Sequence, residues 1–558
     1  MDTVSMRRLQ LVRFVLFAVC CSSSACSESR RGAVPCTMVG STKCGTGCKT
    51  DSDCGHGLYC GSSSTCVADC TAGGSSCGPD ETCDATGRCV SLSGGPDLAG
   101  AIQCPDGLMC NVACAGGTST TISGKVYDPA GKNGLYNVAV YVPAGPLAPL
   151  PKGVPTGSDA CSCAALYSSG AIVSTSTAED GTFTLSNAPV GSSVPLVIQV
   201  GKWRRQYHVS VTSCQDNPQS NGSLAFPTTV AAGNTDDNIP DIAVSTGSAD
   251  TLECLMRRIG IDAGEYVAGN ASTGHVHVFS GGSSAGGGGF GGGGSRAGRP
   301  EQPAMPGAPS SPTDLWSTQA QLMPYDIVLL SCEGGETYNA NPPALEAYLD
   351  AGGRVFASHF HYAWFAGPLG SNQSYSAPMD WGPNLASWAA GSGMSNGPIG
   401  GVIQTTLNGS TMPFPKGVSL QKWLTNVNAL GQNGVPSGEL SIYQPRYNST
   451  VAATNTPSQP WITSDASGMA GSTMYLSFDT PVNPPVSPDN IPAYCGRAVF
   501  SDLHVSGDPT TSDQSPPPGG CANTDLSPQE KALEFMLFDL SSCVIPDTVA
   551  PPMGVPLQ

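Results

Sequence analysis

Five side chains in the second half of the sequence could do chemistry together, because each follows a short apolar segment of strand length. They are Glu333, His359, His361, Asp502 and His504. Imidazole and carboxylate groups in one place can hold a divalent metal ion, or can act as a base with the carboxylate that orients it. Residues two apart on an extended chain point the same way, so we expect His359 and His361 on one face.

The elements that must position these side chains are strands that alternate with helices. Residues 326–330, 355–357 and 497–501 are apolar segments of strand length, and residues 344–351 have a helical pattern that stops at Gly352. Such alternation predicts a parallel sheet with helices on its faces. Parallel strands deliver their carboxyl ends to one edge, where ligands bind. We therefore expect the five side chains in one pocket at this edge, with the glutamate near its rim.

A structural hypothesis makes the same geometric prediction without any chemistry. Polar side chains at a strand edge, and buried histidines in particular, often only satisfy loop backbone groups. Cys332, in the same segment, is either a free thiol or half of a disulfide. Natural disulfide partners by position are Cys254 with Cys543 and Cys495 with Cys521. These pairings would leave Cys332 free, although spacing alone does not fix disulfide connectivity.

The composition limits the classes of protein to which this chain could belong. The chain has 558 residues, enough for several domains, and its 24 basic against 42 acidic side chains give a net charge of −18. No basic segment offers a track for phosphates, so nucleic acid is excluded as a partner. The 24 cysteines, many at regular spacing, predict disulfides and an oxidising compartment.

Residues 1–26 have the features of a signal peptide. Arg7, Arg8 and Arg13 precede the short apolar segment 14–21, and small residues follow it. Cys26 is then either a lipid-anchor cysteine or a disulfide cysteine after plain signal cleavage, and both alternatives stay open. No later segment is apolar and long enough to span a bilayer, so a lipid anchor would be the only contact with a membrane.

Residues 27–115 form a cysteine-rich module with an internal repeat. The first copy has the spacing C-x5-C-x5-C-x5-C and the second C-x6-C-x5-C-x5-C, at Cys48, Cys54, Cys60 and Cys66 and at Cys70, Cys77, Cys83 and Cys89. Few large apolar residues lie between the cysteines, so cross-links must stabilise the module. The paired C-x2-C spacing of zinc sites is absent. We therefore predict disulfides and a binding or spacing role.

Residues 116–247 alternate in the manner of β-strands, and Asp180-Gly181 predicts a hairpin turn. The motifs at residues 124–131 and 180–185 resemble those of the carboxypeptidase regulatory-like domain. That resemblance implies a prealbumin-like β-sandwich, an accessory domain without catalytic residues. Cys161 and Cys163 lie in an insertion between strands, where a local disulfide is plausible.

Residues 248–545 resemble the class I glutamine amidotransferase-like fold, nearest to its ThuA-like branch. The similar segments are residues 277–281, 325–328, 351–359 and 496–504. The resemblance implies an α/β domain of the flavodoxin/amidotransferase-like class with a mainly parallel sheet, interrupted by a glycine-rich insertion at 281–311 and followed by a tail at 546–558. His359 stands where amidotransferases have their nucleophilic cysteine, so the resemblance does not imply their thiol chemistry.

Two functional hypotheses follow. The order of the domains resembles that of secreted proteins of the myxobacterial type. It favours an exported or envelope-anchored binding protein, extracellular or on the outer-membrane or periplasmic face, whose α/β domain is degenerate and whose ligand is a carbohydrate or protein. The alternative is an extracellular hydrolase or metal-dependent enzyme that acts on a saccharide or small molecule. Under that alternative the metal ligands are His359, His361, Asp502 and His504, and the cofactor is a divalent metal ion.

Overall fold

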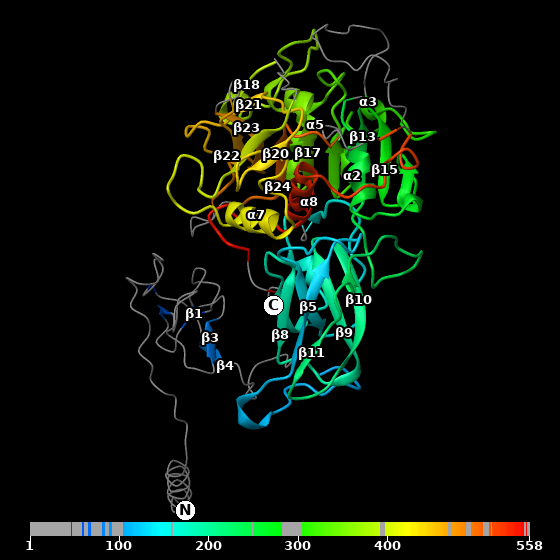
Figure 1. Cartoon of the computed structure of the whole chain (residues 1–558), viewed down its shortest axis with the longest axis vertical. Coiled ribbons are helices and arrows are strands. Elements are labelled where there is room, and N and C mark those ends of the chain that lie inside the picture. The colour runs from blue at the N-terminus through cyan, green and yellow to red at the C-terminus, as the bar shows by residue number, and fades with distance from the viewer. Residues whose placement is uncertain are drawn as a thin grey trace, which may run out of the picture. The chain divides into compact units, whose positions relative to one another are not determined.

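A computed structural model gives the architecture of the chain (Figure 1). It describes residues 46, 49, 59–60, 65–67, 81–83, 89–91, 104–157, 160–247, 249–281, 304–390, 397–466, 471–486, 493–505, 513–514, 516–551 and 554. The chain divides into two compact units. One comprises residues 1–101 with 486–491, and the other comprises residues 102–485 with 492–558. The expected signal peptide at 1–26 and most of the insertion at 281–311 lie outside the described residues.

In the first unit, both copies of the cysteine repeat form a small antiparallel strand pair at the same place. β1 (Tyr59–Cys60) pairs with β2 (Cys66–Val67), and β3 (Glu81–Cys83) pairs with β4 (Cys89–Ser91). The last two cysteines of each copy lie opposite each other, Cys60 with Cys66 and Cys83 with Cys89. The repeat in the sequence is therefore a repeat in structure.

Two sheets that pack face to face begin the second unit. One sheet has the order β10 (Trp203–Val211), β9 (Gly191–Val200), β6 (Ala139–Pro143) and β7 (Ala171–Ser176). The other contains β5 (Thr121–Tyr127), β8 (Thr182–Ser186), β11 (Asp216–Pro218) and β12 (Leu224–Ala225). Alternation makes this arrangement possible. In β8, Phe183 and Leu185 are buried while their neighbours are exposed.

The turn at Asp180-Gly181 forms, but it does not close a hairpin. Gly181 has a φ of 85°, and the Asp180 carboxylate accepts the Thr182 backbone N–H at 2.9 Å. β7 pairs with β6 and β8 pairs with β5, so the turn connects the two sheets instead. Turn chemistry predicted the reversal of the chain, and only the packing decides which strands pair.

A ten-stranded sheet is the framework of the remainder of the second unit. Its order is β14 (Tyr266–Ala268), β15 (Val276–Ser280), β13 (Ile242–Thr246), β16 (Ile327–Leu330), β17 (Arg354–Ser358), β24 (Gly496–Ser501), β23 (Ser472–Thr480), β22 (Ser458–Ser464), β19 (Ile399–Ile403) and β20 (Leu440–Ile442). The pairings from β14 to β24 are parallel, and those from β24 to β20 are antiparallel. The sheet is therefore mixed, whereas the sequence predicted a mainly parallel one, because residues 399–480 add antiparallel strands at one side. A separate strand pair consists of β18 (Ser387–Trp388) and β21 (Ser449–Thr450).

β13 corrects the expected boundary between the sandwich and the α/β region. Its residues belong to the segment 116–247, which the sequence assigns to the sandwich. In the structure it lies inside the large sheet and is parallel to both β15 and β16. All five of its residues are buried, as expected for a strand covered on both faces. The large sheet therefore takes its first strand from before residue 248.

Helices cover the sheet, and local sequence signals determine where they begin and end. They are α2 (Leu252–Arg258), α3 (Ser311–Asp314), α4 (Gln319–Leu322), α5 (Pro342–Asp350), α6 (Ala363–Ala366), α7 (Pro415–Asn426) and α8 (Pro528–Ser541). α8 begins at the predicted capping box, in which Ser527 and Glu530 satisfy each other's backbone N–H. α5 ends where Gly352, with a φ of 115°, donates to the carbonyl of Leu349.

The sandwich and the large sheet share one core rather than standing apart. The rings of Trp203 on β10 and Phe538 on α8 lie 5.3 Å apart, and Tyr136 stacks on Phe535 at 5.9 Å. The Trp423 indole on α7 donates to the Gly134 carbonyl at 2.7 Å. Figure 1 shows α7 and α8 on the side of the large sheet that faces the sandwich strands.

Disulfides reinforce this junction, and they correct the predicted pairings. Within the described residues the pairs are Cys104–Cys110, Cys114–Cys214, Cys161–Cys495, Cys163–Cys543 and Cys254–Cys521, and the free cysteine is Cys332. Cys161 and Cys163 do not form a local bond but reach across to the α/β region. The predicted pairs Cys254–Cys543 and Cys495–Cys521 are wrong, because proximity in sequence order did not reveal how the sandwich insertion docks. The bonds indicate an oxidising environment. Among the described residues, we find no helix with the length and apolar character needed to cross a bilayer.

Candidate functional site

Three neighbouring parallel strands of the large sheet end at one edge, and each is followed by a side chain that could do chemistry. β16 leads to Cys332, β17 to His359 and β24 to His504. β17 pairs with both other strands in parallel register. Their carboxyl ends therefore meet, as expected for the ligand-binding edge of a parallel sheet.

We name Cys332, His359 and His504 the Cys-His-His cluster. The Cys332 Sγ lies 3.2 Å from the His359 Nδ1, and the two imidazole rings are 5.0 Å apart between centroids. One ligand atom of each residue lies within 4.8 Å of the other two. All three side chains are buried, with exposed fractions of 0, 2 and 0%. A thiol and two imidazoles at this separation could surround one metal ion.

The backbone turns sharply at His359 and separates it from His361. His359 has a φ of 47°, in the left-handed region that costs a residue other than glycine some free energy. The following residues form a 3-10 helix, η6 (His359–Tyr362), rather than the extended chain predicted from the sequence. In consequence the two histidines do not point the same way.

His361 has structural partners and lies outside the cluster. Its Nε2 donates to the Ser331 carbonyl at 2.9 Å, and its Nδ1 lies 2.6 Å from the Thr337 Oγ1. Burial lowers its pKa to about 4, so the ring is neutral. The prediction that His361 belongs with the candidate ligands is therefore corrected. This histidine satisfies a backbone carbonyl, as the structural hypothesis expected.

Some nitrogen atoms of the Cys-His-His cluster have no hydrogen-bond partner among the residues that the structure describes. They are His359 Nε2 and both ring nitrogens of His504, all of which are buried. Burial lowers the pKa of both imidazoles well below the usual value, and the Arg446 charge lowers both further. Burial also raises the pKa of the Cys332 thiol to about 12. Buried polar atoms are nearly always satisfied in native proteins, so these nitrogens are candidate positions for a ligand.

Asp502 lies at the same strand end, two residues before His504. One carboxylate oxygen, Oδ2, accepts the Asn448 backbone N–H at 2.8 Å, while Oδ1 is buried and has no partner within the described part of the chain. Burial raises the pKa of this carboxyl to about 7. The metal-sized set does not include Asp502, although the sequence analysis counted it among the ligands.

Arg446 brings a buried positive charge to this region. The residue is 7% exposed, its Nη1 donates to the Gln444 carbonyl at 2.8 Å, and none of the described residues bonds to its Nε. Its backbone N–H lies 3.4 Å from the Asp502 carbonyl oxygen. Burial lowers the pKa of the guanidinium, while the nearby Cys332 and Asp502 raise it. Arg446 could not be predicted as a site residue from the sequence, because no motif marks the loop that carries it.

Glu333 is buried at 5% exposure, so it is not at an open rim. The Glu333 carboxylate lies close to Gly281, just after β15. A Cβ atom added to that glycine would be 3.1 Å from the Glu333 Oε1. Glu333 does not belong to the group of described residues whose ligand atoms lie close enough together to hold one metal ion. Its neighbour Glu336 fixes a loop, since its carboxylate accepts the backbone N–H groups of residues 369–371.

Asp250, after β13, ties the segments of the cluster together. Its carboxylate accepts the Ser358 hydroxyl at 2.7 Å and the Val505 N–H at 2.7 Å. The adjacent Ala249 N–H donates to the Cys332 carbonyl at 3.0 Å. One short segment thus holds the chain beside all three members. The sequence analysis did not single out Asp250, because it assigned β13 to the sandwich.

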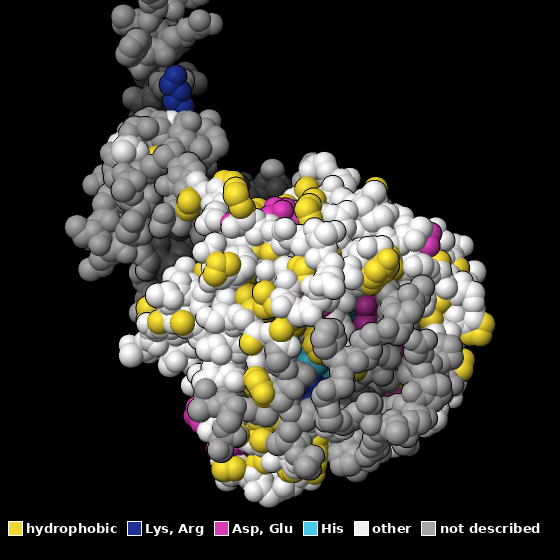
Figure 2. Space-filling view, turned by 90° about the horizontal axis from the view of Figure 1, so that it is seen from above, with side chains coloured by type: hydrophobic (Ala, Val, Ile, Leu, Met, Phe, Trp, Pro, Cys, Tyr) yellow, Lys and Arg dark blue, Asp and Glu magenta, His cyan; other side chains and the backbone are white. Residues whose placement is uncertain are grey.

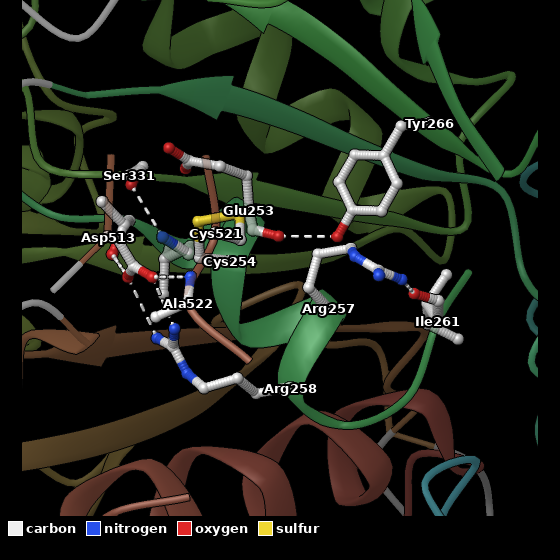
Figure 3. The surroundings of a disulfide bond; sticks show 12 residues. Glu253, Cys254, Arg257, Arg258, Ile261, Tyr266, Ser331, Asp513, Cys521 and Ala522 are labelled. Atoms are coloured by element: carbon white, nitrogen blue, oxygen red, sulfur yellow. Dashed lines mark hydrogen bonds and ion pairs between the residues drawn. A yellow bond between two sulfur atoms is a disulfide. The ribbon is translucent and has the colours of Figure 1, made fainter. Parts of the chain in front are cut away.

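A second buried polar network lies next to Asp250 and is drawn in Figure 3. Arg258 on α2 pairs with Asp513 at 2.7 Å, and the disulfide Cys254–Cys521 fixes the neighbouring loop. Glu253, also on α2, is 2% exposed, and its Oε2 has no partner. Burial, with Asp250 and Asp513 nearby, raises the pKa of Glu253 to about 8.

The surface has a hollow on the face drawn in Figure 2. Imidazole and Lys or Arg side chains are visible together at its base, and an acidic side chain lies at its margin.

Comparisons with known proteins do not assign the chain to a family. No family model and no curated protein matches it. Among solved structures, it is similar to a chain in an N-terminal interface mutant of a type II cohesin–X-dockerin complex from Acetivibrio cellulolyticus. The aligned parts are 16% identical and cover 26% of this chain and 85% of that chain, with a TM-score of 0.14. A likeness at that TM-score carries no argument about fold or function.

Proposed function

We propose that the chain is an exported metalloprotein in which Cys332, His359 and His504 bind one transition-metal ion. A single observation carries the proposal. Three adjacent strand ends bring one sulfur and two imidazoles within 4.8 Å of one another, and the imidazoles keep nitrogen atoms without any other partner. A metal ion would satisfy those nitrogens.

The donor set favours zinc. Thiolate and imidazole are the usual zinc ligands, at about 2.3 Å and 2.0–2.1 Å from the ion. Asp250 serves as the outer support of the site, because it fixes the residue before His359 and the residue after His504. Aspartate–serine and aspartate–amide bonds of this kind hold ligands in position without contacting the metal.

Three protein ligands leave one position of a tetrahedral zinc ion open, which is the arrangement of catalytic rather than structural zinc sites. An ion held in this way lowers the pKa of a bound water and supports hydrolysis. The activity that fits best is therefore metal-dependent hydrolysis of an extracellular saccharide or small molecule. Asp502 Oδ1 and Arg446 Nε, both without partners, are the polar atoms available to a substrate.

The proposal also includes export of the chain and the identities of its sandwich and α/β domains. The basic and apolar segments before Cys26 support export, with a lipid anchor as one alternative. The motifs at residues 124–131 and 180–185 support a carboxypeptidase regulatory-like sandwich, and the segments around His359 and His504 support a ThuA-like domain.

One observation favours the other hypothesis, a non-enzymatic binding protein. The members of the Cys-His-His cluster are exposed by only 0 to 2%, which suits a closed structural site better than an open catalytic one. In that case the recognition of a surface carbohydrate or protein falls to the sandwich and the cysteine-rich module, and the metal only stabilises the fold.

Metal analysis of the full chain tests the proposal. The protein is produced in an oxidising compartment, loaded with Zn²⁺ or Co²⁺ in the absence of reductant, and freed of excess ion. We expect one ion per chain, and for Co²⁺ a sulfur-to-metal charge-transfer absorption from Cys332. Cys332→Ser should lose that absorption, and His504→Gln should lose the ion. The matched control is His208→Gln, because His208 is exposed on β10. Absence of stoichiometric metal from the wild type would refute the proposal.

A further inference from the structure

We infer that Cys161 and Cys163, with their partners in the α/β region, form a thiol–disulfide exchange site. We name the bonds from these residues to Cys495 and Cys543 the tether disulfides. One molecule of a dithiol reductant releases both tether disulfides and leaves a local Cys161–Cys163 bond. The exchange is independent of the metal site, because the free cysteine of the described residues, Cys332, is buried.

The tether disulfides share one cavity and are accessible. All four of their cysteines line a cavity of about 100 Å³ between the sandwich and the α/β region. Cys161 is exposed, and the other three are half-buried. In the bond between Cys254 and Cys521, by contrast, Cys254 is only 1% exposed. Because exchange requires access to a sulfur atom, a reductant in solution should reach the tether disulfides first.

The tether disulfides restrain the middle of the sandwich insertion. On one side, the Val154 N–H donates to the Met323 carbonyl at 2.9 Å, and on the other the Leu166 carbonyl accepts the Gln199 Nε2 at 2.9 Å. Between these anchors, Cys161 has a φ of 58°, in the left-handed region that costs a residue other than glycine some free energy. Release of the tether disulfides therefore lets this segment rearrange while its ends stay in place.

A bond between Cys161 and Cys163 is within the reach of a disulfide. The Cα atoms of residues two apart are separated by about 7 Å at most, and disulfides span Cα distances of about 4.4–6.8 Å. One residue separates the two cysteines, so a Cys161 thiolate stays close to the Cys163 sulfur however the segment moves. The local bond that the spacing suggests is thus the second state of the site, and the structure shows the tethered state.

The exchange consists of three successive thiolate attacks. A thiolate of the dithiol attacks the exposed Cys161 sulfur and displaces the Cys495 thiolate. The second thiolate of the reductant then closes the reductant's own disulfide and frees the Cys161 thiolate. That thiolate attacks the Cys163 sulfur and displaces Cys543. In total, two protein disulfides become one, the dithiol is oxidised to a disulfide, and its two protons end on Cys495 and Cys543.

A positive charge at the cavity favours the first leaving group. The Arg354 side chain lines the cavity, and its Nη1 donates to the Cys495 carbonyl at 2.9 Å. A nearby guanidinium stabilises a thiolate, and a thiolate of lower pKa leaves faster. Burial instead raises the pKa of the Cys332 thiol to about 12, so that thiol does not compete in the exchange.

The experiment treats the full chain, without denaturant, with increasing amounts of dithiothreitol. Free thiols are trapped with N-ethylmaleimide at intervals, and tryptic peptides are identified by mass spectrometry. Trypsin leaves Cys161 and Cys163 together in the peptide 153–202, and it leaves Cys495 and Cys543 in two other peptides. The three peptides are linked before reduction and can be followed separately after it.

We expect Cys495 and Cys543 to become alkylated together. The peptide 153–202 should then appear alone, unalkylated and lighter by two hydrogen atoms than its dithiol form. The Cys254–Cys521 bond should persist at this stage, because Cys254 is buried.

Two double variants isolate the exchange step. In Cys163→Ser with Cys543→Ser, one tether disulfide remains and the local bond cannot form, so reduction should alkylate both Cys161 and Cys495. The matched control is Cys104→Ser with Cys110→Ser, which removes a disulfide elsewhere in the same unit. It should give the pattern of the wild type.

Two results in the wild type would overturn the exchange site. If Cys161 and Cys495 are alkylated while Cys163–Cys543 stays intact, the reductant opens one bond and no internal exchange follows. If Cys254–Cys521 opens as fast as the tether disulfides or faster, they are reached only through unfolding of the chain. Neither result bears on metal binding, so the proposed function stands or falls separately.

Discussion

The Ser358 hydroxyl donates a hydrogen bond of 2.7 Å to the carboxylate of Asp250, which lies 108 residues earlier in the chain. Asp250 follows β13 and Ser358 ends β17, so the bond crosses the sheet edge between two parallel strands. The other oxygen of the same carboxylate accepts the Val505 N–H, next to His504. A single carboxylate thus bonds both to the residue before His359 and to the residue after His504.

We predict that Asp250→Asn weakens metal binding without removing a ligand. The amide can accept only through its oxygen, so at least one of the bonds to Ser358 and Val505 is lost. Loss of an outer support of this kind costs about 10- to 100-fold in metal affinity. Competition titration with a chromogenic chelator measures the affinity, and the Co²⁺ spectrum reports whether the ligand set has changed.

Asp314→Asn is the matched control, because Asp314 is an exposed aspartate in the same unit. A purely structural role for Asp250 would lower the thermal stability and leave the metal affinity of the folded fraction unchanged. That result would contradict the assigned role.

The carboxyl edge of the sheet could be foreseen from the sequence, because parallel strands must deliver their ends together. Apolar segments before residues 332, 359 and 504 were enough to place those residues at one edge. The choice among them could not be foreseen. His361 turns away because the chain enters a 3-10 helix at a left-handed His359, and nothing in the apolar spacing signals that turn.

Neither the role of Asp250 nor the disulfides between the sandwich and the α/β region could be predicted from the sequence, for a related reason. β13 reads as one more strand of an alternating segment, and only its pairing with β15 and β16 shows that it belongs to the large sheet. Cys161 and Cys163 stand two residues apart and suggest a local bond. Their partners, Cys495 and Cys543, follow from how the sandwich docks, which depends on the whole core.

A second prediction concerns pH and Glu253. Its folded-state pKa is raised from the usual 4.5 to about 8, chiefly by burial. A raised pKa means that the folded state binds the proton more tightly than the unfolded state. The stabilisation is therefore complete below about pH 4.5 and is lost as pH rises through about 8. Chemical denaturation of the metal-free protein across this window should show the free energy of unfolding falling with pH.

Glu253→Gln, which stays neutral, should flatten this pH dependence. An unchanged slope in Glu253→Gln would mean that the carboxyl is not the group that titrates. Because Glu253 is neither a cluster member nor an acceptor of a bond from one, this test does not depend on the metal.

The third prediction tests the disulfides between the sandwich and the α/β region. Cys161–Cys495 and Cys163–Cys543 close loops of 334 and 380 residues and lie side by side. Removing only one leaves the other to close nearly the same loop, so it should cost little. Removing both by Cys→Ser changes should lower the free energy of unfolding by about 6 kcal/mol, the value that loop-closure entropy gives for loops of this size.

The control is Cys104–Cys110, which closes a loop of only six residues in sequence separation. Its removal should cost about 2 kcal/mol. Denaturant unfolding monitored by tryptophan fluorescence provides the comparison. Additive losses, in which each single deletion costs about half of the double deletion, would show that the two bonds do not act on the same loop.

The last prediction contrasts two histidines that the sequence grouped together. Within the residues that the structure describes, neither ring nitrogen of His504 has a hydrogen-bond partner, whereas His361 bonds to Ser331 and Thr337. In the metal-free protein, His504→Leu removes buried, unsatisfied polar atoms and should therefore raise the free energy of unfolding. His361→Leu leaves a buried carbonyl and hydroxyl without their partner and should lower it by about 1–3 kcal/mol. Metal binding should respond in the opposite sense, lost in His504→Leu and retained in His361→Leu. Denaturation curves with and without Zn²⁺ measure all four quantities. If both variants destabilise the metal-free protein equally, then His504 is an ordinary core residue, and the nitrogens that carry the proposed metal site have no functional meaning.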